Sequence, residues 1–234
     1  MNPGPDVREL VLANPVWHAL HGPQRALAEE AAGGGALRYH PEITIFSAVD
    51  ELDEAGWAAL GELVGVGGAA ILSRDEVPPA PKRWAEVFRG WGVQLLAGEL
   101  AAGVDVDLEK LSSDDVPEMI DLTRATSPGP FLQRTIELGG YLGVRRGGRL
   151  VAMAGERMRV PGHTEISAVC THPSIQRQGL GTALTLGVAR AIRARGDEAF
   201  LHVAEENTGA LRLYRSLGFE PRRRVQAVAA RFDG

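Results

Sequence analysis

The segment 169–182 restricts the possible folds of this chain more than any other part of its sequence. It reads VCTHPSIQRQGLGT, in which an apolar strand ends, a short loop follows, and a long helix begins at Gly179 and Gly181. The first turn of a helix leaves backbone N–H groups without partners and carries partial positive charge, and glycine lets a ligand approach the backbone closely. The segment therefore predicts a strand–loop–helix unit that binds a pyrophosphate. The alternative is a glycine-containing helix start that binds no ligand.

Two familiar phosphate-binding motifs do not fit this segment. No Gly-Lys-Ser or Gly-Lys-Thr follows the glycines, so the segment is not a Walker loop. Leu184 stands where the dinucleotide-binding pattern Gly-x-Gly-x-x-Gly has its third glycine. A nucleotide-type cofactor would therefore have to be held in another way.

Helix-like and strand-like patterns alternate along the chain. Apolar residues at helical spacing and capping signals predict helices over 15–30, 54–63, 114–126, 179–195 and 207–217, the last closed by Gly218. Apolar or alternating runs predict strands over 69–72, 93–96, 141–145, 150–158, 165–171, 199–203 and 225–232, with a hairpin turn at 146–148. Mixed in this way, the elements predict a layered α/β (α+β) fold. A change of character near residue 105 predicts two parts, 1–105 and 106–234.

Composition narrows the possible functions. A net charge of −5 argues against a general electrostatic hold on nucleic acid. Cys170 is the single cysteine, so neither an intramolecular disulfide nor a cysteine-based metal cluster can form, and we expect no metal site. No apolar run approaches the roughly 18 residues that span a bilayer, and residues 1–6 lack a signal-peptide pattern. The expected location is the cytoplasm, without membrane or nucleic-acid partners.

Two motifs together resemble a known family. The pattern Gln176-x-x-Gly179-x-Gly181 is similar to the coenzyme A signature of the GNAT N-acetyltransferase superfamily, and the segment NTGALRLYRSLGF at 207–219 is similar to a second segment of that family. The resemblance covers roughly residues 106–234. It implies the GNAT fold, in which helices flank a mixed, mostly antiparallel sheet, and it implies acetyl-CoA as the acyl donor.

The same resemblance assigns residues to the cofactor. The backbone at Val169, Cys170 and Thr171 would pair with the pantetheine arm, and Asn207 would contact that arm. The pyrophosphate would lie in the loop at the start of the helix, formed by Gln176, Arg177, Gln178, Gly179, Leu180, Gly181 and Thr182. For Asn207 a plain helix cap is the alternative.

The expected chemistry needs a proton donor and a base. Asn207 and Tyr214 lie about two helical turns apart and so share a face. A phenol has a pKa near 10, so Tyr214 would stay protonated and could donate to the departing thiolate, the role that the resemblance also implies; a core aromatic is the alternative. Glu165, at the start of the strand before the loop, is the candidate base, which requires a raised pKa or a water relay. His163 is the competing base, and a surface carboxylate is the other interpretation of Glu165.

The first part, residues 1–105, carries neither motif. The segment NPVWHAL at 14–20 and the residues after it look like the N-terminal part of two-part bacterial GNAT proteins similar to the glycine N-acyltransferase group. This resemblance implies a degenerate GNAT-like half that completes the fold on the acceptor side.

These observations predict an acetyl-CoA-dependent N-acetyltransferase. No motif activates Cys170 as a nucleophile, so we expect a primary amine to attack the thioester directly in a ternary complex. The acceptor would be a small-molecule amine or a peptide N-terminus, and the chain a monomer or a homodimer. The alternative function is a non-catalytic acyl-CoA-binding sensor.

Overall fold

The structure is a computed structural model that describes residues 7–103 and 105–234 of the 234-residue chain. Residues 1–6, where the sequence shows no leader pattern, lie outside the described residues. The α-helices of the described residues are α1 Val7–Ala13, α2 Pro15–Leu20, α3 Glu54–Val64, α4 Val116–Thr126, α5 Leu180–Ala194 and α6 Thr208–Ser216. Short 3-10 turns lie at η1 Arg25–Leu27, η2 Ser113–Asp115, η3 Thr135–Leu138 and η4 Pro173–Ile175.

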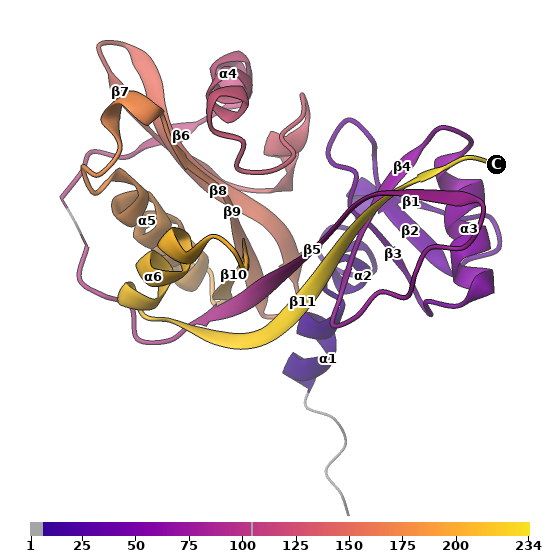
Figure 1. Cartoon of the computed structure of the whole chain (residues 1–234). Helices are drawn as coiled ribbons and strands as arrows, with labels where there is room; N and C mark the ends of the chain where they lie inside the picture. Colours follow the sequence, from indigo (N-terminus) through magenta and orange to yellow (C-terminus); the bar gives the residue numbers. More distant parts are fainter. Residues whose placement is uncertain (1–6, 104) are drawn as a thin grey trace, which may run out of the picture.

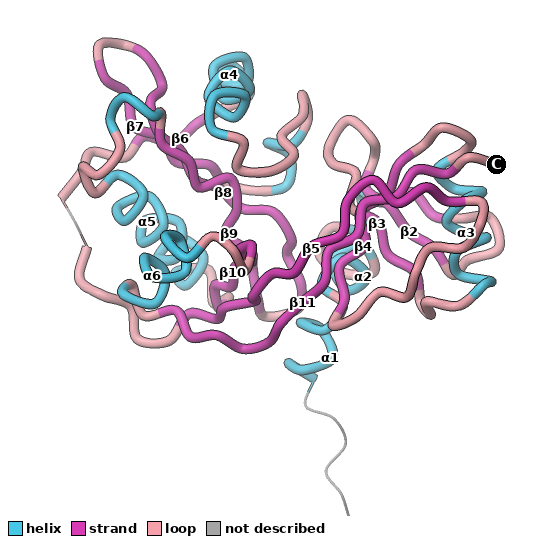
Figure 2. Tube along the Cα trace, in the orientation of Figure 1, coloured by secondary structure: helices cyan, strands magenta, loops and turns pink. Residues whose placement is uncertain are grey.

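The strands of the described residues form two sheets (Figures 1 and 2). The small sheet contains β1 Ala28–Glu30, β2 Ala36–Tyr39 and β3 Ser47–Val49. The large sheet has the order β4-β11-β5-β10-β9-β8-β7-β6. Its strands are β4 Ala69–Arg74, β5 Trp84–Ala97, β6 Glu109–Leu111, β7 Tyr141–Arg146, β8 Arg149–Val160, β9 His163–Thr171, β10 Glu198–Ala204 and β11 Phe219–Phe232.

The large sheet is antiparallel except at one place, where β9 and β10 run parallel. Helices cover both of its faces. On β8, Ala152 and Ala154 pack in one cluster with α5 and α6, whereas Met153 packs with α4 in another. This alternation follows from the two-residue period of a strand. The mixed, mostly antiparallel sheet with flanking helices confirms the expected fold class.

The two parts of the chain share the large sheet. β4 and β5, from the first 105 residues, pair with β11, and β5 also pairs with β10. The long β5–β11 ladder runs from Phe219 opposite Ala97 to Phe232 opposite Trp84, and it crosses the molecule in Figure 1. The division near residue 105 and the degenerate character of the first part stay predictions.

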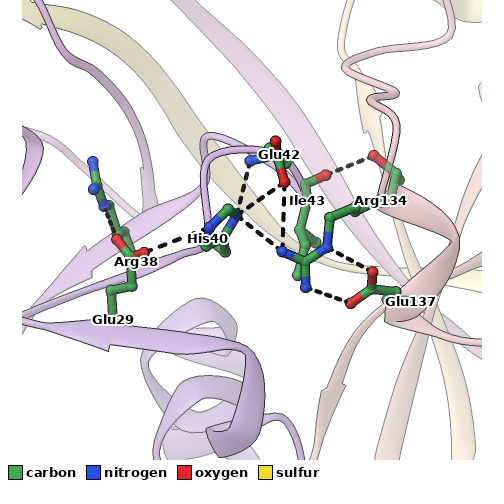
Figure 3. A network of polar contacts seen from close by, with 8 residues as sticks. Glu29, Arg38, His40, Glu42, Ile43, Arg134 and Glu137 are labelled. Carbon is green, nitrogen blue, oxygen red and sulfur yellow. Dashed lines mark hydrogen bonds and ion pairs between the residues drawn. The ribbon is translucent and has the colours of Figure 1, made fainter.

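A polar cluster also connects the two parts (Figure 3). Arg134 donates to both carboxylate oxygens of Glu137, at 2.7 and 2.9 Å. The Arg134 amide donates to the carbonyl of Glu42 at 3.1 Å, and the hydroxyl of Thr135 donates to the carbonyl of Ile43 at 2.6 Å. These bonds hold the segment that follows α4 against the loop between β2 and β3.

Most of the expected elements are present, but one helix is wrong. The chain is helical only over Pro15–Leu20, then turns at Gly22 and Pro23, and residues Ala28–Glu30 pair with β2. Proline removes a backbone donor and breaks a helix, so the expected helix 15–30 cannot continue. Among the described residues, no helix is both long and apolar enough to cross a membrane.

Candidate functional site

A cleft opens where the two parallel strands separate. The β9–β10 pairing runs from His163 opposite Glu198 to Ile166 opposite Leu201. Beyond that point β9 continues to Thr171 and β10 to Ala204. Between these ends lies a cavity of about 390 Å³. Its lining comes from the end of α4 and the residues after it, from β8, β9 and β10, from the loop before α5, and from α6 and its cap. The lining residues are Thr126, Ser127, Pro128, Arg157, Ile166, Ser167, Ala168, Val169, Cys170, Thr171, Gln176, His202, Val203, Ala204, Asn207, Ala210 and Tyr214.

β9 has a bulge beside this cleft. Between the paired positions Ser167 and Cys170, β9 contains one residue more than β8. Ala168 adopts a φ of 51° there, in the left-handed region that residues with a Cβ rarely visit. A bulge changes the direction in which nearby backbone and side-chain groups point. Val169–Thr171, the residues expected to pair with the cofactor arm, line the cavity directly after this bulge.

The start of α5 offers unpaired amides. Arg177 and Gly179 have φ values of 63° and 77°, and no side chain caps the helix. Within the described residues, none of the amides of 177–182 donates a hydrogen bond to another protein group. The loop is exposed except around Leu180. These donors at the start of a 15-residue helix are what the sequence predicts for a pyrophosphate.

Asn207, the residue that caps α6, and Tyr214 of α6 also line the cleft. The Asn207 side chain accepts a hydrogen bond from the amide of Ala210 at 3.1 Å, so the helix-cap interpretation of Asn207 is confirmed, although the residue also lines the cavity. Tyr214 is 9% exposed and packs edge-on against Phe219. Burial raises the pKa of Tyr214 to about 12, so the phenol keeps its proton at neutral pH.

Glu165 does not line the cleft; it lies behind two residues that do. Its side chain is fully buried. Arg157 donates to Oε2 at 2.7 Å and to Oε1 at 2.5 Å, and Nδ1 of His202 donates to Oε1 at 2.6 Å. Arg157 and His202 both line the cavity. Glu165 therefore holds a guanidinium and an imidazole in the wall of the cleft.

The ionisation of Glu165 differs from what direct base catalysis requires. Burial alone would raise its pKa, but the charge of Arg157 and the hydrogen bonds from Arg157 and His202 outweigh burial and lower the pKa to about 2. The raised pKa that the sequence interpretation requires is therefore not found. The surface-carboxylate interpretation is also wrong, because the side chain is buried.

A buried amide fixes the other side of His202. Nε2 of Gln94 lies 3.0 Å from Nε2 of His202 and 2.9 Å from the carbonyl of Leu12, while Oε1 of Gln94 accepts from Arg222 at 2.7 Å. With the Gln94 amide donating both protons, Nε2 of His202 accepts and Nδ1 donates to Glu165. The network thus runs from the cleft through β10 and β5 to β11.

The other residues considered for catalysis either do not line the cleft or make interactions that serve another purpose. His163, the competing base, is buried at the start of β9, 3.7 Å from Glu198, and is not part of the cavity lining. His172 accepts from the amide of Ser174 at 3.3 Å and so shapes the turn before α5. Burial raises the pKa of the Cys170 thiol to about 11, which disfavours a nucleophilic thiolate. Within the described residues, no group of three or more His, Cys, Asp or Glu side chains is arranged to hold a metal ion.

Sequence reasoning missed Arg157, His202 and the residues after α4. A signal was available for Arg157, because an arginine within the apolar strand 150–158 needs a buried partner and Glu165 follows across a hairpin. The register shift in β8 between Glu156 and Arg159, which surrounds Arg157, cannot be read from the sequence.

In this chain a mixed sheet separates between two parallel strands, and a helix with free amides follows. A structure of an acetyltransferase of the GNAT family from Novosphingobium aromaticivorans superposes with a TM-score of 0.86 and 38% sequence identity, covering 95% of this chain and 99% of that one. The model of the FR47-like protein family matches residues 141–228. The chain therefore belongs to the GNAT family, as the two motifs predict.

More distant and more local similarities agree with this family. A GCN5-related N-acetyltransferase from Kribbella flavida shares the fold, with a TM-score of 0.64 and 22% identity over 94% of both chains. The mycothiol acetyltransferase of Thermobispora bispora is 48% identical over 56 residues, which is 24% of this chain and 19% of that protein. The N-alpha-acetyltransferase RimI of Mycobacterium tuberculosis is 37% identical over 83 residues, 34% of this chain and 51% of that protein. The chain thus matches about a fifth to a half of these curated relatives.

Proposed function

We propose that this protein is an N-acetyltransferase that transfers an acetyl group from acetyl-coenzyme A to a primary amine in a ternary complex. The observation that carries the proposal is the cleft itself, which is lined both by Gln176, the residue directly before the free amides of the α5 start, and by Tyr214 on α6. The names of the relatives support acetyl transfer, and family membership supports an acyl-coenzyme A donor.

The donor fits the groups that line the cleft. The amides of 177–182 would bind the pyrophosphate, the bulged backbone at Val169–Thr171 would pair with the pantetheine arm, and Gln176 and Asn207 lie along the same cavity. Each charge-assisted hydrogen bond contributes roughly 1.5–3 kcal/mol. When bound there, acetyl-coenzyme A supplies the acetyl group as a reactive thioester.

Tyr214 is the proposed proton donor. The amine nitrogen forms the new bond to the acetyl carbon and gives its proton to water, while the carbon–sulfur bond breaks and the sulfur takes a proton from the phenol, which solvent then restores. Because burial makes this phenol a weaker acid than a free one, we expect a hydrogen bond to the departing sulfur to supply most of the stabilisation.

For Glu165 we propose a positioning role instead of direct proton abstraction. Its lowered pKa makes it a weak base, and it reaches the cleft only through Arg157 and His202. Fixing these two side chains would keep the junction between donor and acceptor in one geometry.

Release of coenzyme A thiol in the presence of a panel of amines tests the proposal. We expect turnover with at least one primary amine, and loss of coenzyme A binding when Gly179 and Gly181 are both replaced by valine. Tight coenzyme A binding without turnover on small amines, aminoglycosides and peptide N-termini would instead identify a sensor. The cytoplasmic location and the monomeric or dimeric state stay predictions.

A further inference from the structure

A second cavity adjoins the cleft. It measures about 270 Å³ and shares five lining residues with the cleft: Pro128, Arg157, His202, Val203 and Ala204. Four of the shared residues lie at the end of β10 or in the wall held by Glu165, and Pro128 follows α4. A molecule in this cavity would therefore lie against residues that also border the place where the donor thioester is expected.

The floor of this cavity is the face of three neighbouring strands. Ala227 of β11 lies opposite Ser73 of β4 on one side and Gly90 of β5 on the other. Gly92 lies opposite Val225 in the next row of that face. All five residues line the cavity. Side chains on one face of a sheet normally fill the space above it. Here the small residues leave room above the sheet, part of which the ring of Phe88 occupies over Gly90.

The walls of the cavity are apolar and aromatic. The side chains of Phe46, Phe88 and Met158 line it. Phe88 is 55% exposed. Its ring lies over Gly90, where an added Cβ would come within 2.5 Å of the ring. The exposed ring thus forms the outer wall of a cavity that its own strand leaves open.

Charge at the cavity favours a cationic head over an anionic one. Arg157 is the nearest cation, but Glu165 neutralises it with two hydrogen bonds. Glu206 lies at the rim, exposed, and within the described residues its carboxylate makes no ion pair. An ammonium group that enters from solvent would meet this carboxylate before it reaches the residues shared by the two cavities.

We propose that this second cavity receives the body of the acceptor, and that the acceptor is a primary amine on an uncharged aromatic or branched-alkyl body. The inference rests on the proposed function, because it places the amine at the residues shared by the two cavities. The volume lies just below the roughly 300–1,000 Å³ of typical ligand pockets, so the body is small.

Two amines that differ only in an aryl group test the inference on the full chain with acetyl-coenzyme A. We expect kcat/KM for 2-phenylethylamine to exceed that for ethylamine on the order of 10- to 100-fold, since burial of one ring in an apolar pocket gives discrimination of this size. Ala227→Leu, which fills the floor, and Phe88→Ala, which removes the outer wall, should both reduce the ratio of the two values towards one.

The matched control is Val87→Ala. Val87 precedes Phe88, is 62% exposed and does not line the cavity, so the ratio should not change. Coenzyme A affinity and thermal melting of each variant show that the fold and the donor cleft are intact. Equal kcat/KM for the two amines in the wild type would overturn the inference and leave the proposed function standing.

If no amine is acetylated, a binding measurement can still test the proposed cavity separately from the proposed function. Calorimetric titration of 2-phenylethylamine into the protein saturated with coenzyme A should show binding that Ala227→Leu weakens at least 10-fold. Such binding without any turnover supports the second cavity and contradicts the proposed function. Absence of binding, or binding that Ala227→Leu leaves unchanged, contradicts the inference.

Discussion

The phenol of Tyr214 is the side chain whose removal tests the chemistry most directly. We expect Tyr214→Phe to lower kcat on the order of 10²-fold, because one preorganised donor to a developing anion contributes about that much. Coenzyme A affinity and melting temperature should change little, since the ring still packs against Phe219. Single-turnover kinetics measures the effect. The buried Tyr141, which lies outside the cleft lining, gives the control variant Tyr141→Phe, and an equal loss of rate in both would refute the role of Tyr214.

Glu165 links the cleft to the stability of the protein. Its pKa falls from 4.5 to about 2 on folding, so the folded state favours the ionised form. The resulting stabilisation is complete above the unfolded pKa and disappears as the pH falls from about 4.5 to 2. Its size is about 3 kcal/mol at 1.36 kcal/mol for each unit of pKa. Glu165→Gln should therefore flatten the fall in unfolding free energy over this pH range.

At neutral pH, Glu165→Gln should lower the unfolding free energy by about 3–5 kcal/mol, because it leaves the charge of Arg157 buried without a partner. Urea unfolding at pH 7 and at lower pH measures both effects. Glu137→Gln is the matched control, since Glu137 pairs with Arg134 at an exposed position and should cost about 1 kcal/mol or less. If the two variants lost similar amounts of unfolding free energy, the buried Glu165–Arg157 pair would contribute no more to stability than an exposed ion pair.

The positions of residues that belong to a sequence motif could be predicted from the sequence. Tyr214 and the loop residues are read from sequence because their spacing along one helix or one loop fixes their position. Arg157 and His202 could not be found in this way, because cross-strand register and a bulge bring them to Glu165. The lowered pKa of Glu165 follows from these partners, so the sequence could not predict it either.

At the scale of elements, one substitution at the start of α5 should change protein stability and coenzyme A affinity in opposite directions. Gly181 lies in the first turn of α5, and an added Cβ would be 3.8 Å from a methyl group of Leu213, an ordinary contact. Gly181→Ala should raise the unfolding free energy by up to about 1 kcal/mol, as alanine favours helix. If the pyrophosphate lies against this backbone, coenzyme A affinity should fall about 10-fold or more.

Calorimetric titration with coenzyme A and urea unfolding measure the two quantities. Gly33→Ala is the control, because nothing lies within 4 Å of its added Cβ and it is remote from α5; neither quantity should change by much. Undiminished coenzyme A affinity in Gly181→Ala would place the pyrophosphate elsewhere.

The element boundaries show why the C-terminal part was easier to predict. α5 and α6 end within a residue or two of their expected limits, because Gly179 and Gly218 mark the helix ends. β5 was expected only over 93–96, yet it spans Trp84–Ala97. The part before residue 93 contains Gly90, Gly92 and several exposed residues, and it is a strand because β11 pairs with it. A strand that forms because a distant segment pairs with it need not show a strand pattern in its own sequence.

At the scale of the whole molecule, the shared sheet predicts that the C-terminal part cannot fold by itself. A fragment of residues 106–234 would keep α5, α6 and the motifs, but β10 and β11 would lose β5, and β11 would also lose β4. We expect this fragment to be unfolded or aggregated, with unpaired strand edges. Circular dichroism and backbone NMR spectra test this.

Co-expression with residues 1–105 is the complementary experiment. The two fragments should associate and recover coenzyme A binding, because the β5–β11 ladder forms between them. A folded fragment 106–234 that binds coenzyme A alone would show that the first part is dispensable for the fold, and that the division near residue 105 separates independent domains.

The place of β11 between β4 and β5 sets the order in which the large sheet can form. During synthesis β4 and β5 leave the ribosome long before β11, the strand that joins them. The sheet therefore cannot close until β11 has been translated. Until then β4 and β5 lack this partner, and unpaired strand edges promote aggregation.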